Sequence, residues 1–203
     1  MSTFLDSSIL LLMLLNPFFV ILYLIDVIRK KTFWQFTHIL ISAGILSFCV
    51  FSAFAILGDV IFISIFQAEF ASFQIFGGVI FLIIGIQFVF KGTTSIDILR
   101  GDSSDLKGAI AMPVMIGPGT ISASVLAGQR LDSGTAILSI FVAISLSIIV
   151  MILLKALHDY VRPKNEKLIE SYAENAGRIM ALYIGTFSVE MVMKGVRAWI
   201  SKF

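Results

Sequence analysis

The feature that most constrains this chain is a series of apolar runs long enough to cross a lipid bilayer as helices. A hydrocarbon core of about 30 Å needs roughly 20 residues at the helical rise. Only 14% of the 203 residues are charged and 58% are hydrophobic, so the chain has too few polar side chains to cover a water-soluble domain. We therefore expect an all-α polytopic membrane protein with a single transmembrane domain over residues 1–203. The six predicted spans are Phe4–Val27, His38–Leu57, Phe73–Phe90, Gly108–Gly128, Thr135–Leu154 and Gly177–Trp199.

The segments outside these runs are short. Val60–Phe66 is apolar but too short to cross the bilayer again, so we expect it to continue the second span or to lie at its end. Lys155–Ala176 is expected to form a helix on the membrane surface after Pro163. The first run contains no Lys or Arg and carries Asp6, which favours a retained spanning helix over a secretory signal.

The basic residues predict how the spans are oriented. Eleven of the 15 Lys and Arg residues lie in the connections after the first, third and fifth spans, and four lie on the opposite side. Because cytoplasmic loops carry the excess of Lys and Arg, both termini are predicted to be periplasmic. The net charge of +2 is too small to indicate a nucleic-acid partner, and the single cysteine, Cys49, excludes a disulfide within the chain.

A weak internal repeat divides the sequence into halves of approximately 1–100 and 101–203. Asn16-Pro17 precedes Gly117-Pro118 by 101 residues. Each half holds three spans, an odd number, so the second half would enter the membrane in the opposite orientation to the first. Inverted repeats with helices interrupted at matching places are typical of secondary transporters. The alternative is a chance likeness between apolar segments.

The prolines and glycines of the first and fourth spans are predicted to interrupt those helices. Proline lacks an N–H and collides with the preceding turn, and glycine tolerates non-helical backbone. The freed backbone groups must face protein, water or a ligand, and two half-helix N-termini facing one cavity would suit a small carboxylate. The alternative is a plain kink, which we favour for Pro17 alone. The candidate substrate-binding residues are Asn16, Pro17, Gly117, Pro118, Gly119 and Thr120.

Few polar side chains lie within the spans. Ser122 and Ser124 follow the Gly-Pro-Gly break and are expected to bond to the turn behind them. Glu190 is the one carboxylate that could lie at depth, where an ionisable group is by default a functional hypothesis. The favoured alternative is an ion pair with Lys194, four residues on. Gln87 falls on Glu190 at an offset of 103 residues, and we expect a helix–helix hydrogen bond there, with ion coupling at Gln87 and Glu190 as the second reading.

Small residues recur on one face of the third and sixth spans. Gly78 and Gly85 share a face of the third span, and Gly177, Ala181 and Gly185 are spaced at four-residue intervals on the sixth. Small side chains let helix backbones approach closely in lipid, where no hydrophobic force drives association. We therefore predict that these faces pack against neighbouring helices.

Five stretches carry a resemblance to a known family. They are Leu15-Asn16-Pro17, Ile75-Phe76-Gly77-Gly78, Met112-Pro113, Gly117-Pro118-Gly119-Thr120-Ile121 and Gly177-Arg178-Ile179-Met180. Together they resemble the MarC family of bacterial inner-membrane proteins, which includes the SnatA-type transporters of small neutral amino acids. The resemblance implies six helices in two inverted halves and cation-driven transport of glycine- or alanine-sized substrates. The chain departs from the family pattern at Gln74, where the family usually has a basic residue, and at Glu190, where it usually has Gln.

Three classes of function are open to a membrane protein of this composition. A secondary transporter, working by alternating access in the inner membrane, accounts for the breaks and the repeat. A non-transporting scaffold or regulatory membrane protein is the alternative, in which the breaks serve packing alone. The sequence has no nucleophile–base motif of an enzyme and no spacing for a metal, and it implies no cofactor beyond a coupling proton or sodium ion. The substrate, the direction of transport, the coupling ion and any homo-oligomer are left open.

Overall fold

The computed structural model describes residues 2–65, 67–91, 115–162 and 166–201, and all the secondary structure in these ranges is helical. The helices are α1 (Ser2–Leu15), α2 (Pro17–Tyr23), α3 (Ile25–Lys30), α4 (Phe33–Val60), the π-helical η1 (Ile61–Ile65), α5 (Phe70–Lys91), α8 (Pro118–Arg130), α9 (Ser133–Val161) and α10 (Glu166–Ile200). Three segments are long and apolar enough to cross a membrane by length and composition: Phe33–Gly58, Phe70–Gln87 and Ser133–Val161. They correspond to the second, third and fifth predicted spans.

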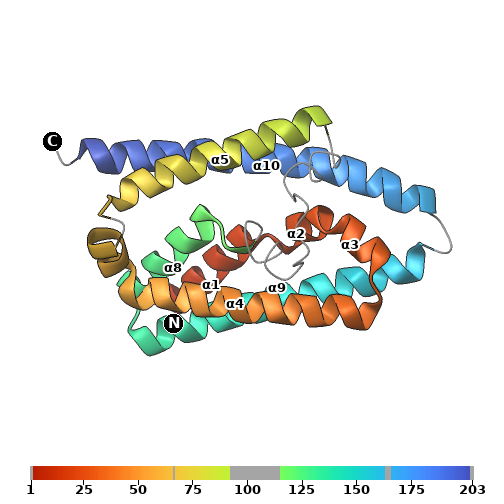
Figure 1. Ribbon diagram of the computed structural model, residues 1–203, viewed down its shortest axis with the longest axis horizontal. Helices are drawn as coiled ribbons and strands as arrows, with labels where there is room; N and C mark the ends of the chain where they lie inside the picture. The colour runs from red at the N-terminus through yellow and green to blue at the C-terminus, as the bar shows by residue number, and fades with distance from the viewer. Residues whose placement is uncertain (1, 66, 92–114, 163–165, 202–203) are drawn as a thin grey trace.

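The helices form an elongated bundle whose long axis they follow (Figure 1). Helices α4 and α9 pack against one another on one side, α5 and α10 pack on the opposite side, and α1 to α3 lie with α8 between the two pairs. Within each outer pair the two helices run in opposite directions, and α8 runs opposite to α1–α3. The end of α3, the start of α4, the end of α9 and the start of α10 lie at one end of the bundle. The end of α4, the start of α5, the end of α8 and the start of α9 lie at the other.

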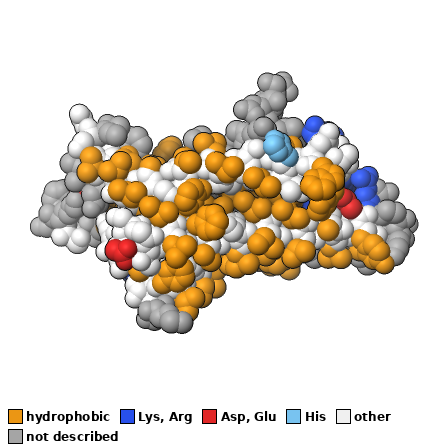
Figure 2. Space-filling model, turned by 90° about the horizontal axis from the view of Figure 1, so that it is seen from below, with side chains coloured by type: hydrophobic (Ala, Val, Ile, Leu, Met, Phe, Trp, Pro, Cys, Tyr) orange, Lys and Arg blue, Asp and Glu red, His pale blue; other side chains and the backbone are white. Residues whose placement is uncertain are grey.

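The outer surface of the bundle is apolar. Figure 2 shows the face that carries α4 and α9, where hydrophobic side chains cover the middle and the charged side chains gather toward the two ends. Large apolar residues such as Ile45 on α4 and Leu153 on α9 are more than 60% exposed. Lipid tails satisfy such a surface, whereas a monomer in water rarely exposes apolar patches of this extent.

The predicted interruption of the first span is confirmed. Helix α1 ends at Leu15 and α2 begins at Pro17, with Asn16 between them at a φ of +39°. This left-handed conformation is one that asparagine tolerates better than most residues, and proline at the first helical position gives up only an N–H that would be unpaired there. A second interruption, at Leu24 between α2 and α3, was not predicted.

The fourth span also contains a helix start where the sequence predicts a break. Gly117 is extended, with φ −107° and ψ 167°, and α8 begins at Pro118. The segment before it, including Pro113, lies outside the described residues. Residues 115–130 therefore cannot form one uninterrupted helix across Pro118.

The helix predicted after Pro163 is confirmed, because α10 begins at Glu166. It is not confined to the segment Lys155–Ala176: residues 155–161 are the end of α9, and residues 166–176 continue without a break into the sixth predicted span. No Pro or Gly separates Glu166 from Gly177, and one interior glycine costs a helix only about 1 kcal/mol, too little to end it. The expectation for Val60–Phe66 is confirmed over Ile61–Ile65, which extends α4 as the π-helical η1.

Small residues bring α5 and α10 into close contact, as predicted. A Cβ atom on Gly85 would lie 3.1 Å from the backbone nitrogen of Gly185 and 3.4 Å from the carbonyl oxygen of Ala181. A Cβ atom on Gly78 would lie 2.8 Å from the carbonyl oxygen of Ser188. The two helices therefore touch through their backbones, which holds the wall of the bundle formed by α5 and α10 together.

Candidate functional site

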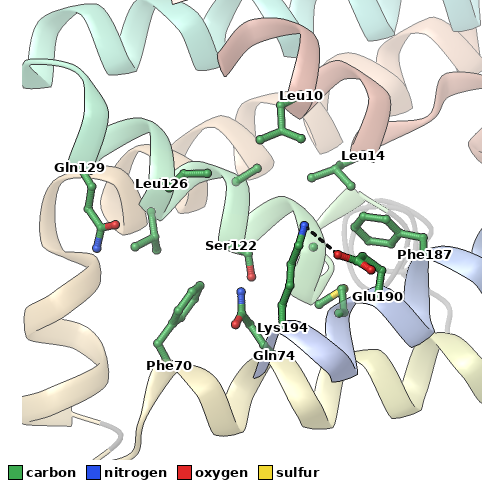
Figure 3. Close-up of a pocket in the computed structure, with 14 residues that line it drawn as sticks. Leu10, Leu14, Phe70, Gln74, Ser122, Leu126, Gln129, Phe187, Glu190 and Lys194 are labelled. Carbon is green, nitrogen blue, oxygen red and sulfur yellow. Dashed lines mark ion pairs between the residues drawn. The ribbon is translucent and has the colours of Figure 1, made fainter. Parts of the chain in front are cut away.

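A cavity of about 160 Å³ lies between α1, α5, α8 and α10. Figure 3 shows its lining side chains converging from the four helices. The lining residues are Leu10 and Leu14 from α1, Phe70 and Gln74 from α5, Gly119, Ser122, Ala123, Val125, Leu126 and Gln129 from α8, and Phe187, Glu190, Met191 and Lys194 from α10. Helix α8 supplies one wall over its length, from the break at its N-terminus to the end near Gln129.

Glycines at the start of α8 leave room for the cavity and fix its position. Gly77 on α5 contacts the ring of Pro118 so closely that any Cβ atom would overlap it. A Cβ atom on Gly119 would lie 3.0 Å from the Phe187 ring and 3.7 Å from the Met191 sulfur. The break is thus packed tightly against α5, and the first turn of α8 faces α10 without side-chain bulk.

Thr120 closes the break rather than facing the cavity. Its side-chain oxygen accepts a hydrogen bond from the Gly117 N–H at 2.9 Å and lies 2.9 Å from the carbonyl oxygens of Gly117 and Met115, to which the hydroxyl donates. Only 4% of Thr120 is exposed. The hydroxyl therefore partners backbone groups that the interrupted helix leaves free, and it does not line the cavity.

The two serines of α8 differ from one another. Ser124 donates to the Thr120 carbonyl at 2.7 Å, as predicted. The prediction that Ser122 bonds the turn behind it is wrong, because its buried Oγ has no hydrogen-bond partner among the described residues. Figure 3 shows the Ser122 hydroxyl and the Gln74 amide pointing toward one another across the cavity. A buried hydroxyl without a partner is costly, and a polar guest would relieve that cost.

Glu190 and Lys194 form the predicted ion pair one helical turn apart on α10. Nζ of Lys194 lies 3.5 Å from Oε1 of Glu190, with the side chains 61% and 55% exposed, respectively. Charge-assisted hydrogen bonds are typically 2.7–2.9 Å long, so the pair is a loose one. Both residues line the cavity, so a positive and a negative charge face the same small space.

The other predicted site residues do not line this cavity. Asn16 and Pro17 follow its lining residue Leu14, and Gly117 and Pro118 precede its lining residue Gly119. Gln87 does not form the predicted helix–helix hydrogen bond through its Oε1, because that buried atom has no partner within the described ranges. The structure therefore gathers Gly119 and Glu190 into one cavity and leaves the remaining candidates beside it or on other surfaces.

Sequence reasoning missed the most deeply buried charge of the described residues. Lys155, counted in the sequence among the loop cations, is only 2% exposed on α9. Its ammonium donates to the carbonyl oxygens of Ile28 at 2.8 Å and Lys31 at 3.1 Å, and to Oδ1 of Asp159 at 2.7 Å. All three ammonium hydrogens have acceptors, and the charge sits at the negative end of the α3 dipole. Lys155 thus holds α9 to the end of α3.

The apolar surface, the long spanning helices and the interrupted ones define a polytopic helical membrane protein. The chain belongs to the MarC family: the model of the MarC family integral membrane protein matches residues 1–200. A protein of Archaeoglobus fulgidus described as a UPF0056 membrane protein is 26% identical over 137 residues, which is 64% of this chain and 63% of that protein. The aligned region thus spans less than two thirds of that relative. No solved structure matches the chain.

Two positions that the family resemblance singled out meet in the structure. Gln74 and Glu190 both line the cavity, from α5 and α10 respectively. The sequence places the two positions on different predicted spans and does not by itself bring them together.

Proposed function

We propose that this protein is a secondary transporter of a small neutral amino acid, working by alternating access, with the cavity beside the α8 break as its substrate site. The observation that carries the proposal is the pair of helix interruptions, at Asn16-Pro17 and at Gly117-Pro118, with an amphipathic cavity beginning at Gly119. Interrupted helices in matching halves are the form in which transporters build substrate sites within the membrane.

The burial pattern of α4 and α9 supports the inverted repeat. Eight buried positions of α4 recur as buried positions of α9 exactly 100 residues later. The pairs are Phe36 and Ala136, Ile39 and Ser139, Leu40 and Ile140, Ala43 and Ala143, Gly44 and Ile144, Ser47 and Ser147, Phe51 and Met151, and Gly58 and His158. The N-caps follow the same offset, with Thr32 before α4 and Asp132 before α9. Chance likeness between apolar runs gives no reason for a shared register of burial.

The direction of the helices agrees with the inversion. Each pair that the repeat relates, α1–α3 with α8, α4 with α9 and α5 with α10, runs in opposite directions (Figure 1). Alternating access then follows from rocking one half against the other around the site.

The size of the cavity supports a small substrate. Another protein's cavity of about 150 Å³ binds benzene, a molecule similar in size to alanine. Leu10, Leu14 and Phe187 restrict what fits beyond that size. Glycine and alanine match this volume, whereas aromatic amino acids exceed it.

The cavity extends along α8 from Gly119 to Gln129, toward the end of the bundle with the α4–α5 and α8–α9 connections. The distribution of Lys and Arg assigns that end to the periplasm, together with both termini. The described conformation then corresponds to a carrier facing outward, with Lys155 holding the cytoplasmic end closed.

Substrate counterflow in proteoliposomes tests the proposal. Vesicles loaded with unlabelled alanine are expected to accumulate external labelled alanine, and Gly119→Val is expected to reduce the initial rate at least about tenfold because the new side chain enters the cavity. Gly134→Val, at an exposed position of α9, is the control and should leave the rate unchanged.

Counterflow that is absent for every small amino acid, under proton and sodium gradients alike, would favour the non-transporting scaffold or regulatory protein. Ion coupling at Glu190 and Gln87 stays a prediction, which the same vesicles can test. Proton-driven uptake that is unchanged in Glu190→Gln would remove Glu190 from that role.

A further inference from the structure

We propose that Glu190 and Lys194 bind the two opposite charges of an amino-acid zwitterion, with Glu190 facing the ammonium and Lys194 facing the carboxylate. The inference rests on the proposed function, because it assigns the substrate groups recognised in the same cavity. It goes beyond the helix breaks, which alone predict a site for a carboxylate and give no group to receive the ammonium.

The geometry of the ion pair favours this role. Four residues apart on α10, the two side chains project into the cavity from one helix face, and their charged atoms lie 3.5 Å apart. The carboxylate and ammonium of an α-amino acid are likewise separated by a single carbon. A zwitterion can therefore lie against the pair with each charge opposite its complement, exchanging one loose contact for two.

Charge balance makes the site selective. The cavity contributes one positive and one negative side chain, so a zwitterion leaves no charge unmatched. A small anion or cation would neutralise one side chain and leave the other without its partner in a partly enclosed space, which is unfavourable. We expect alanine to bind, and propionate and glycinamide to bind much more weakly.

Ser122 and Gln74 extend the half of the site that receives the carboxylate. In Figure 3 the Lys194 ammonium lies between Glu190 on one side and the Ser122 hydroxyl and Gln74 amide on the other. The Ser122 Oγ is buried and has no partner among the described residues, so a carboxylate oxygen placed beside Lys194 would accept its hydrogen bond. Leu10, Leu14 and Phe187 form the apolar side that faces the substrate's side chain.

Equilibrium binding of labelled alanine to the purified full-length protein tests the assignment without requiring transport. Glu190→Gln and Lys194→Gln are each expected to weaken binding at least about tenfold, or 1.4 kcal/mol. Ser122→Ala should weaken it less. The matched control is Arg197→Gln, an exposed position on the same helix that does not line the cavity. Because Glu190 and Lys194 are more than half exposed, the melting temperatures without ligand should stay close to that of the parent protein.

The outcomes separate this proposal from the transport proposal. Binding that is equal in all variants, competition by propionate as strong as that by glycine, or no binding to the parent protein would each overturn the zwitterion site. If Glu190→Gln and Lys194→Gln support counterflow at the rate of the parent protein, the transport proposal holds and the zwitterion site is overturned. If alanine binding depends on both charges but no counterflow occurs, the zwitterion site holds and the transport proposal is overturned.

Discussion

Gly128→Ala is expected to destabilise the protein by about 3 kcal/mol, although alanine is normally the better helix former by about 1 kcal/mol. Gly128 lies near the end of α8, where the backbone of Ala55 on α4 occupies the space that any Cβ atom would need. The obstructing atoms are the carbonyl group and Cα of Ala55, which no rotamer change can move away. Helices α4 and α8 must therefore separate, and their packing is lost together.

The measurement is reversible unfolding in mixed micelles, with Gly134→Ala as the control. A Cβ atom on Gly134 meets only Oδ2 of Asp132, at 3.5 Å, so this variant is expected to be neutral or slightly more stable. Equal stability of the two variants would show that α4 and α8 do not touch at Gly128.

Lys155→Met is expected to have a similar effect, about 3 kcal/mol, for a different reason. Methionine preserves most of the apolar stem but removes the ammonium, leaving the carbonyl oxygens of Ile28 and Lys31 without that donor. Each buried group deprived of its partner costs about 1–3 kcal/mol. Since the contact joins α9 to α3, we also expect this end of the bundle to open more readily, which would appear as faster proteolysis of the α3–α4 connection.

Lys30→Met is the control for this variant, because Lys30 is exposed near the same end of α3. It removes the same charge but leaves the contacts of Lys155 in place. If Lys155→Met unfolds no more readily than Lys30→Met, the buried ammonium contributes nothing to the interface between α9 and α3.

The sequence predicts the parts of this fold that depend on local backbone chemistry or on long apolar runs. Proline in a helix interior removes a backbone hydrogen bond, so the interruption at Pro17 and the helix start at Pro118 could be located from the sequence. The runs that became α4, α5 and α9 are apolar over about the thickness of a bilayer, so their existence followed from length. Their ends were placed less well, because capping at Thr32 and Asp132 extended the helices beyond the apolar residues.

The cavity could not be predicted in the same way, because it depends on which helices become neighbours. Gln74, Ser122 and Lys194 come from three helices, and no spacing in the sequence relates them. Lys155 was misread for a similar reason. In the sequence it is one of several basic residues at the predicted cytoplasmic end, and only the position of the Ile28 and Lys31 carbonyls makes it a buried donor. Sequence patterns located the break, whereas tertiary packing determined what lies beside it.

The most direct test of the account asks whether water and substrate reach the cavity next to the α8 break. In a Cys49→Ser background, Ser122→Cys is labelled with a membrane-impermeant thiol reagent applied from the predicted periplasmic side, and Ser147→Cys, fully buried on α9, serves as the unreactive control. We predict that Ser122→Cys reacts and that alanine slows the reaction. A cysteine at this position that stays unreactive from both sides, or that reacts at the same rate with and without small amino acids, would contradict a substrate cavity there.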